Sequence, residues 1–166
     1  MRVAIVSDIH ANLQALEAVL EQAQGRGCDE LWCLGDVVGY GADPEACVAL
    51  IREHANVCLV GNHDLAVTGA LSTEAFSELA RRAAEWTAGV ISPDSRTFLR
   101  SLSPLDEGRA VGLYHASPRD PVWEYVTSAA QAQAGFEVAL RRVSAVGHTH
   151  VATAFCRVGE EETVGA

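Results

Sequence analysis

The stretch Val3-Ala4-Ile5-Val6-Ser7-Asp8-Ile9-His10 (residues 3–10) decides how the rest of the chain is interpreted. Four apolar residues, two of them valine and one isoleucine, predict a short buried strand. Asp8 and His10 come directly after it, two positions apart. In an extended segment residues i and i+2 point the same way, so both side chains can reach one metal cation. The stretch therefore predicts a strand that ends in a pair of metal ligands.

The same arrangement recurs where later apolar runs end. We expect strands at residues 31–34, 57–60, 109–115 and 143–146, and their ends carry the motifs Gly35-Asp36, Gly61-Asn62-His63-Asp64, His115 and Gly147-His148-Thr149-His150. Amphipathic helices are expected between the first strands, after the N-cap candidates Asn12 and Asp43. This alternation is typical of parallel β-α-β units, whose strands deliver ligands at their carboxyl ends. The polar motifs should therefore gather at one edge of a sheet.

The middle of the chain carries no ligand candidate. We expect residues 72 to about 102 to be helical, with one helix starting at Ser72 and another at Ser92, and then a turn at 103–108. A further helix should hold Phe136, Val138, Ala139 and Leu140, and residues 151–158 can form one strand before a turn at Glu160-Glu161-Glu162. Because no linker or repeat interrupts the chain, we interpret residues 1–166 as a single domain.

Together the motifs offer more ligands than one metal ion requires. Carboxylates, neutral imidazoles and an amide oxygen are the donors that divalent cations use. Asp36 has two carboxylate oxygens and can bridge two ions about 3.5–4 Å apart, while Asn62 adds a ligand without adding charge. His54 lies late in a predicted helix without a partner motif, and we expect it to have no part in the site.

His63 is expected to act differently from the ligands. It follows Asn62 directly, so its side chain should project elsewhere, toward a bound substrate, and Asp64 is placed to hold its imidazole in one tautomer. We expect His63 to donate a proton to a leaving oxygen or to stabilise a transition state as a cation. Asn12 can reach a phosphate, although helix capping explains it more simply, and Tyr40 either lines a substrate pocket or packs.

Composition and charge exclude several classes of protein. The formal net charge is −10, which argues against bulk binding of nucleic acid because tracking a phosphate backbone needs a basic face. The sequence holds no run of about 18 apolar residues that could span a membrane. The five cysteines are odd in number and lack C-x-x-C spacing, as expected of free thiols in a reducing compartment. We therefore expect a cytoplasmic protein.

The ordered set Asp8-x-His10, Gly35-Asp36, Gly61-Asn62-His63-Asp64, His115 and Gly147-His148-x-His150 resembles the calcineurin-like metallophosphoesterase superfamily. Residues 6–13 and 35–41 are similar to its small prokaryotic phosphodiesterase-like members. The resemblance implies a four-layer α/β/β/α sandwich, two mixed sheets flanked by helices, with a dinuclear metal site at the carboxyl edge of the strands.

The resemblance also implies a role for each ligand. One metal ion would be held by Asp8, His10, Asp36 and His150, and the other by Asp36, Asn62, His115 and His148. His63 would fall on the family's catalytic histidine and Asp64 on its partner. Two divalent ions are implied, manganese foremost, with iron, zinc, nickel or cobalt as alternatives.

We expect a hydrolase in which a water activated by two metal ions attacks a phosphoester, a phosphodiester before a monoester. The alternatives are a phosphatase acting on protein or small-molecule monoesters and a non-catalytic scaffold that retains the fold. The expected partner is a small phosphoester substrate, without membrane association. The short stretch after His150 leaves three alternatives open: a shortened second sheet, a second sheet completed by another subunit of a homo-oligomer, or a second sheet some of whose residues are missing from this sequence.

Overall fold

The computed structural model describes residues 1–158 and 161–165, with the side chains of residues 1–157. Its first sheet holds three parallel strands in the order β1-β2-β3. In register, Val6 lies beside Cys33, and Cys33 lies beside Cys58, so the three strands end at one edge. The strands are β1 (Val3–Val6), β2 (Glu30–Cys33) and β3 (Val57–Cys58).

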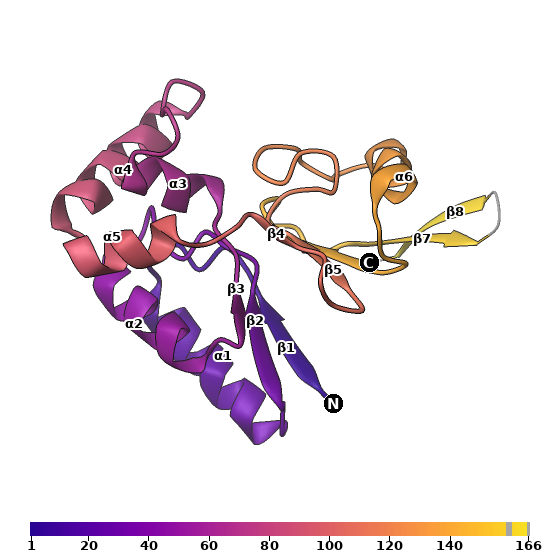
Figure 1. The fold of residues 1–166 in the computed structure, drawn as a ribbon, viewed down its shortest axis with the longest axis horizontal. Helices are drawn as coiled ribbons and strands as arrows, with labels where there is room; N and C mark the ends of the chain where they lie inside the picture. Colours follow the sequence, from indigo (N-terminus) through magenta and orange to yellow (C-terminus); the bar gives the residue numbers. More distant parts are fainter. Residues whose placement is uncertain (159–160, 166) are drawn as a thin grey trace.

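Two helices follow the first two strands and lie along the same side of this sheet (Figure 1). They are α1 (Leu13–Gly25) and α2 (Pro44–His54). The side chain of Asn12 accepts a hydrogen bond from the Ala15 backbone N–H, 3.1 Å away, and so caps α1. Pro44 occupies the first turn of α2, where its missing N–H costs nothing.

The second sheet, in the order β4-β5-β6, is mixed. It contains β4 (Leu105–Asp106), β5 (Gly112–Tyr114) and β6 (Ser144–Val146). β4 is antiparallel to β5, but β5 and β6 run parallel, so the segments after these two strands emerge at the same edge. The sheets pack through the buried side chains Trp32, Leu34, Leu59 and Leu113. The expected fold of two sheets flanked by helices is therefore confirmed, although the first sheet is parallel throughout rather than mixed.

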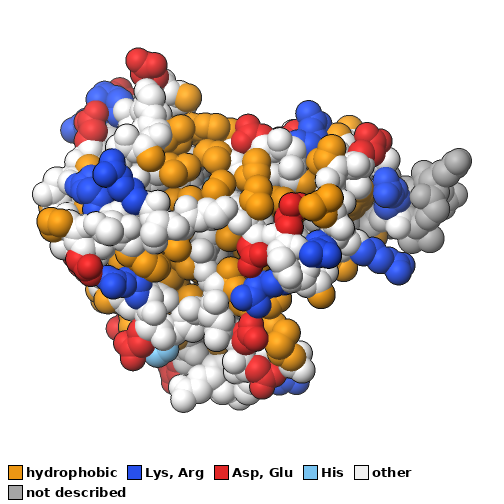
Figure 2. Space-filling view, viewed as in Figure 1, with side chains coloured by type: hydrophobic (Ala, Val, Ile, Leu, Met, Phe, Trp, Pro, Cys, Tyr) orange, Lys and Arg blue, Asp and Glu red, His pale blue; other side chains and the backbone are white. Residues whose placement is uncertain are grey.

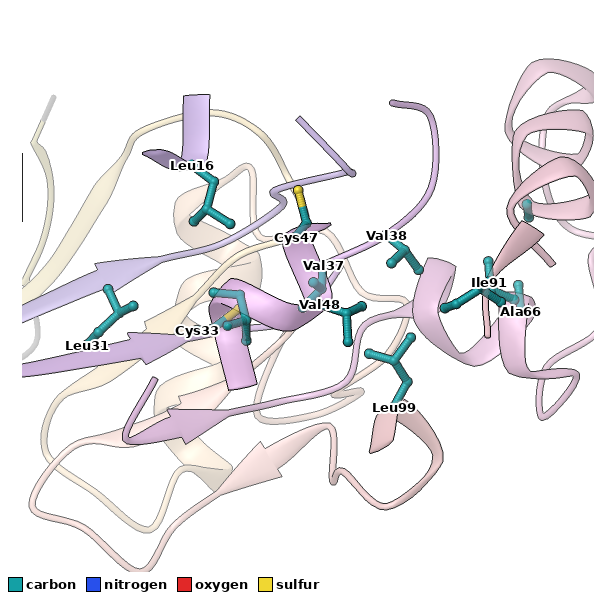
Figure 3. Packing of buried hydrophobic residues seen from close by; sticks show 13 residues of the cluster. Leu16, Leu31, Cys33, Val37, Val38, Cys47, Val48, Ala66, Ile91 and Leu99 are labelled. Carbon is teal, nitrogen blue, oxygen red and sulfur yellow. The ribbon is translucent and has the colours of Figure 1, made fainter. Parts of the chain in front are cut away.

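The main core fixes the loop that carries Asp36. Val37 and Val38 are completely buried, next to Cys47 and Val48 of α2 and to Leu99 (Figure 3). All of residues 31–39 are buried. Because interiors are packed like crystals, this loop has little freedom to move.

The other helices differ in places from the expected ones. They are α3 (Asn62–Thr68), α4 (Glu78–Val90), α5 (Pro93–Arg100) and α6 (Ala129–Val138). The prediction that a helix starts at Ser72 was wrong. Ser77 caps α4 instead, and its hydroxyl oxygen accepts a hydrogen bond from the Ala80 N–H at 3.2 Å. α6 ends at Val138 because Ala139 is extended, so Ala139 and Leu140 lie outside the helix that was expected to include them.

The C-terminal part forms an antiparallel hairpin of β7 (Ala154–Val158) and β8 (Glu161–Gly165), at one end of the molecule in Figure 1. Instead of the expected turn, Glu161 and Glu162 belong to β8, while Glu160 lies outside the described residues. In the part of the chain that the structure describes, no helix is both long and apolar enough to cross a membrane. On the face in Figure 2, arginines lie among acidic side chains rather than in one basic patch.

Candidate metal centre

The loops after β1, β2, β5 and β6 converge and bring six ligand candidates into two groups, while His63 forms a further, overlapping group with His10 and Asp36. The first contains Asp8, His10 and His150, and the second contains Asp36, His115 and His148. Within each group, one donor atom from every residue lies within 4.8 Å of the others. Each group has the nitrogen and oxygen donors that first-row divalent cations accept.

Asp36 lies between the two groups. Its Oδ2 atom is 3.8 Å from His10 Nε2 and 3.5 Å from His115 Nε2. Its other oxygen, Oδ1, accepts the His63 backbone N–H at 2.8 Å, which fixes the carboxylate. With 1% of its surface exposed, Asp36 can serve both groups from one buried position.

Two histidines are oriented by backbone carbonyls. His10 Nδ1 lies 3.2 Å from the Val38 oxygen, and His115 Nδ1 lies 2.9 Å from the Leu34 oxygen. Because a carbonyl only accepts, these contacts place the ring proton on Nδ1 and leave the Nε2 lone pair facing the centre. His10 Nε2 faces His150 Nε2 at 3.1 Å, and His115 Nε2 faces Asn62 Oδ1 at the same distance.

Unsatisfied atoms in the centre fit divalent cations. Asp8 Oδ1 and His148 Nε2 are buried and have no hydrogen-bond partner. A buried polar atom without a partner costs about 1–3 kcal/mol, and a coordinated cation would remove that cost. Asn62 Oδ1, buried beside His115, completes a donor set of carboxylate, imidazole and amide. We conclude that the residues present suit two divalent ions.

Backbone strain is concentrated at these residues. Among the described residues, seven other than glycine have positive φ, and five of them are the ligand candidates Asp8, His10, Asp36, His148 and His150, with φ from 49° to 65°. Aspartate and histidine tolerate this region better than most residues do, yet such conformations persist only where the surroundings enforce them, as at functional sites.

Glycine is required where the loops approach most closely. A Cβ atom on Gly61 would lie 2.0 Å from Asp36 Oδ1 and 2.5 Å from the Asp36 backbone nitrogen. Gly35 has φ of 100°, and a Cβ there would lie 2.7 Å from the Gly61 nitrogen. Both residues therefore allow the ends of β2 and β3 to meet around Asp36.

Burial shifts the pKa values of the ionisable side chains in the metal centre. It raises the pKa of Asp36 well above the usual range, and the nearby carboxylates of Asp64 and Asp8 raise it further. Burial also lowers the pKa of His10 and His148, and that of His115 to about 4. For His148, the Asp8 carboxylate and then a hydrogen bond to the Trp123 backbone partly oppose this lowering of the pKa. Burial therefore favours the neutral form of these three imidazoles, which is the form that binds metal.

His63 borders the centre without a fixed partner. It lies in the first turn of α3, 5% exposed, and its buried Nδ1 has no hydrogen-bond partner. Its ring centroid is 4.9 Å from that of His10 and 4.5 Å from that of Tyr40. Burial, followed by the neighbouring histidines, lowers its pKa to about 3. The imidazole is held close to the ligands with one nitrogen unengaged.

Asp64 does not orient the His63 ring as the sequence suggested. Its carboxylate accepts the backbone N–H groups of Val37 (3.3 Å), Val38 (3.0 Å) and Gly61 (3.0 Å). Asp64 points back from the start of α3, so it ties the loop after β2 to the loop after β3. Burial raises its pKa to about 6 despite these hydrogen bonds.

Aromatic side chains that the sequence analysis overlooked surround the centre. Tyr125 stacks on His148 with ring centroids 4.1 Å apart, and Phe76 lies 4.8 Å from His63. Trp123 contacts Phe76 at 5.4 Å. The only sequence signal was the Trp123-Glu124-Tyr125 group shortly after His115.

Asn12 and Tyr40 lie beside the ligand candidates, whereas His54 does not. Asn12 caps α1 and, with Tyr40, also lines a cavity shared with Asp8, His10 and His150. His54 is exposed at the end of α2 and borders a different cavity, away from the ligands.

Comparison with known proteins agrees with this geometry. The sequence model of the calcineurin-like phosphoesterase superfamily domain matches residues 1–163. The uncharacterized protein MJ0912 of Methanocaldococcus jannaschii is 44% identical over 129 residues, which is 75% of this chain and 53% of the relative. A symmetrical bis(5'-nucleosyl)-tetraphosphatase of Pseudomonas putida is 31% identical over 122 residues, 67% of this chain and 40% of that protein.

A solved structure is similar over nearly the whole chain. The metallophosphoesterase from Sphaerobacter thermophilus superposes with a TM-score of 0.83 at 42% identity, covering 95% of this chain and 63% of that one. This chain therefore spans between about half and two thirds of the length of MJ0912 and of the solved metallophosphoesterase.

Proposed function

Because this chain belongs to the calcineurin-like phosphoesterase superfamily, we propose that it forms the metal centre of a metal-dependent phosphoesterase that prefers phosphodiesters. One observation carries the proposal: Asp36 Oδ2 lies within 4 Å of Nε2 atoms from two separate ligand groups, 3.8 Å from His10 and 3.5 Å from His115. A shared carboxylate is the arrangement that two adjacent cations require.

The chain's own residues divide between two ions. Asp8, His10, Asp36 and His150 would hold one, and Asp36, Asn62, His115 and His148 the other. When bound, the ions lower the pKa of a water molecule and neutralise phosphate charge. The carbonyls of Val38 and Leu34 hold the rings of His10 and His115 in the tautomer that ligation needs.

His63 is proposed to act on the leaving oxygen. It lies against His10 and Tyr40, and its Nδ1 is buried beside Gly39, which leaves Nε2 as the nitrogen that could act on a substrate. A ring N–H on Nε2 can donate a hydrogen bond to the oxygen that departs from phosphorus, stabilising the charge that develops there. Asp64 contributes indirectly, by holding the loops that carry Asp36 and His63.

The charge around the centre favours a diester over a monoester. A diester carries a single negative charge at neutral pH, whereas a monoester carries up to two and needs more compensation. The chain has no lysine, and in the described structure no arginine lines the cavity beside Asp8 and His150. Arg119, close to His115 in sequence, pairs with Glu124 at 3.4 Å. The proposed ions are therefore left to neutralise the phosphate.

We propose manganese as the metal, because carboxylate, amide and imidazole donors together suit it, with iron, zinc, nickel and cobalt as competitors. The relative from Pseudomonas putida is named for a nucleotide substrate, which supports a small nucleotide-type ester here. The five free cysteines support a reducing compartment, the cytoplasm.

A metal-by-substrate screen tests the function. Metal-stripped protein is reloaded with each first-row divalent ion and assayed on bis(4-nitrophenyl) phosphate and 4-nitrophenyl phosphate. We expect turnover that needs added metal, is highest with manganese and is faster on the diester. Faster turnover of the monoester would overturn the diester preference. No turnover of either reporter with any ion would favour the non-catalytic scaffold.

A further inference from the structure

A cavity of about 760 Å³ opens beside the first ligand group. Its wall toward the metal centre contains Asp8, His10 and His150, and the surrounding wall includes Tyr40 and Leu79. Both Tyr40 and Leu79 are exposed. An ester whose phosphate lies at the centre can therefore extend its organic group into a partly apolar space.

Tyr40 is held rigidly in this wall. Its φ is 60°, an uncommon conformation for a bulky aromatic residue, while 45% of its surface stays exposed. The flanking glycines fit closely: a Cβ on Gly39 would lie 2.6 Å from His63 Nδ1, and one on Gly41 would lie 2.4 Å from the His10 carbonyl oxygen. The backbone of this loop is therefore packed against two histidines of the site, and the Tyr40 ring lines the cavity.

The charged side chains in the cavity wall determine which ligands the cavity can bind. Asp8 and Asp43 line it, and no arginine is among the lining residues that the structure describes. Further phosphate groups would be repelled, whereas an uncharged group would not. Asp43 precedes α2 but makes no side-chain capping bond, so its carboxylate remains able to accept an N–H from a ligand.

We infer that this cavity binds the base of a nucleotide ester, stacked on Tyr40, while the phosphate lies at the metal centre. The Tyr40 ring contacts the His10 ring, with centroids 4.8 Å apart, so the tyrosine lies directly beside the first ligand group. Aromatic rings bind every base by stacking, and a carboxylate such as Asp43 accepts the amino N–H of a base. This inference rests on the proposed function and defines its substrate class.

Binding, rather than turnover, provides the test. Adenosine 5′-monophosphate and methyl phosphate carry the same phosphate group and differ in the nucleoside. Their dissociation constants are measured by calorimetry on the manganese-loaded protein. We expect the nucleotide to bind roughly 5- to 150-fold more tightly, the usual range for stacking one base. Tyr40→Ala should abolish this ratio, and Tyr40→Phe should retain most of it.

Tyr125→Ala is the comparison variant, because Tyr125 is exposed to a similar degree (50% against 45% for Tyr40) but stacks on His148 and does not line the cavity. Equal affinities in the wild type, or an unchanged ratio in Tyr40→Ala, would overturn the inference. Loss of the ratio in Tyr125→Ala alone would also overturn it, by moving the base to the opposite side. Base-dependent binding without any hydrolysis would refute the proposed phosphoesterase and leave this site standing.

Discussion

The Nε2 atoms of His10 and His150 face each other at 3.1 Å, although the two residues are 140 positions apart in the chain. The other ring nitrogen of His10 faces the Val38 carbonyl, so the Nε2 of His10 carries a lone pair. His150 Nε2 also lies 3.4 Å from Asp8 Oδ1. Two imidazoles and a carboxylate this close together could hold one cation, and Asp36 would join this group to the second one.

Removing one half-site should remove one metal ion. We expect His150→Ala to retain about one equivalent of manganese where the wild type binds two, because His115, His148 and Asn62 are untouched. Elemental analysis after saturation and desalting measures this. His54→Ala is the control, since His54 is exposed on α2 away from the ligands. A wild type that binds at most one equivalent would contradict the two-ion proposal.

Asp36→Ala should weaken both sites together and abolish activity, because one carboxylate contacts both ligand groups. Calorimetric titration with manganese should show lower affinity for both equivalents, in contrast to His150→Ala. If the variant lost activity while binding two ions as tightly as the wild type, Asp36 would not be a bridge.

Gly61→Ala tests the close approach around Asp36. The added Cβ would lie 2.5 Å from the Asp36 backbone nitrogen, so the backbone must move. We expect the free energy of unfolding to fall by about 1–3 kcal/mol and manganese affinity to fall with it. Gly89→Ala is the matched control: it lies in α4 with open space around it, and should stabilise the protein by roughly 0.5–1 kcal/mol. Denaturant titrations of both variants measure the difference.

The cysteines predict a pH dependence away from the site. Burial, with smaller effects from Asp43 and Glu17, raises the pKa of Cys47 to about 11. Above about pH 9 the thiol ionises in the unfolded chain but not in the folded one, so Cys47 should reduce stability as pH rises from 9 to 11. Cys47→Ala should show a shallower decline of the free energy of unfolding over this range, measured by denaturant unfolding.

Thiol labelling tests the burial of Cys47 separately. Exposed Cys156 should react with iodoacetamide at pH 8, whereas labelling of Cys47 in the native protein would contradict its burial.

Local sequence patterns located β1 and the approximate positions of β2, β3, β5 and β6, but they missed β4, which lies within the expected turn at 103–108. β1 spans residues 3–6 as expected, β2 is shifted by one residue at both ends, and β6 begins one residue late. β3 and β5 are shorter than the expected strands at 57–60 and 109–115. These strands could be located because buried strands are apolar and their ends are marked by polar residues. The start of α4 could not be located in the same way, since Ser72 and Ser77 both precede helix-forming residues and only packing selects Ser77.

The roles of Asp64 and Tyr40 depended on contacts distant in sequence. Asp64 seemed a partner for its neighbour His63, but backbone N–H groups 26 and 27 residues away engage it. The positive φ of Tyr40 and its position between two histidines follow from the packing of Gly39 and Gly41. No local pattern encodes such contacts.

Substitution of His63 tests whether the protein is an enzyme or a non-catalytic scaffold. If His63 acts on the leaving oxygen and holds no metal, His63→Ala should keep two equivalents of manganese. The rate should fall by roughly 10²–10⁴-fold, the usual contribution of a positioned acid or base. The loss should be largest for an alkyl phosphodiester, whose alkoxide departs poorly, and small for a nitrophenyl ester, whose phenolate departs without help.

The test is completed by measuring turnover of both esters by His63→Ala and by His63→Asn. Asparagine restores a hydrogen-bond donor but cannot exchange a proton near neutral pH. Partial rescue by asparagine would indicate that His63 acts as a donor of a hydrogen bond. No rescue, with a strong dependence on the leaving group, would indicate proton transfer. An equal loss on both esters would argue for electrostatic stabilisation of the transition state. Loss of metal from His63→Ala would instead make His63 a ligand, in agreement with its donor atom lying within 4.8 Å of those of His10 and Asp36.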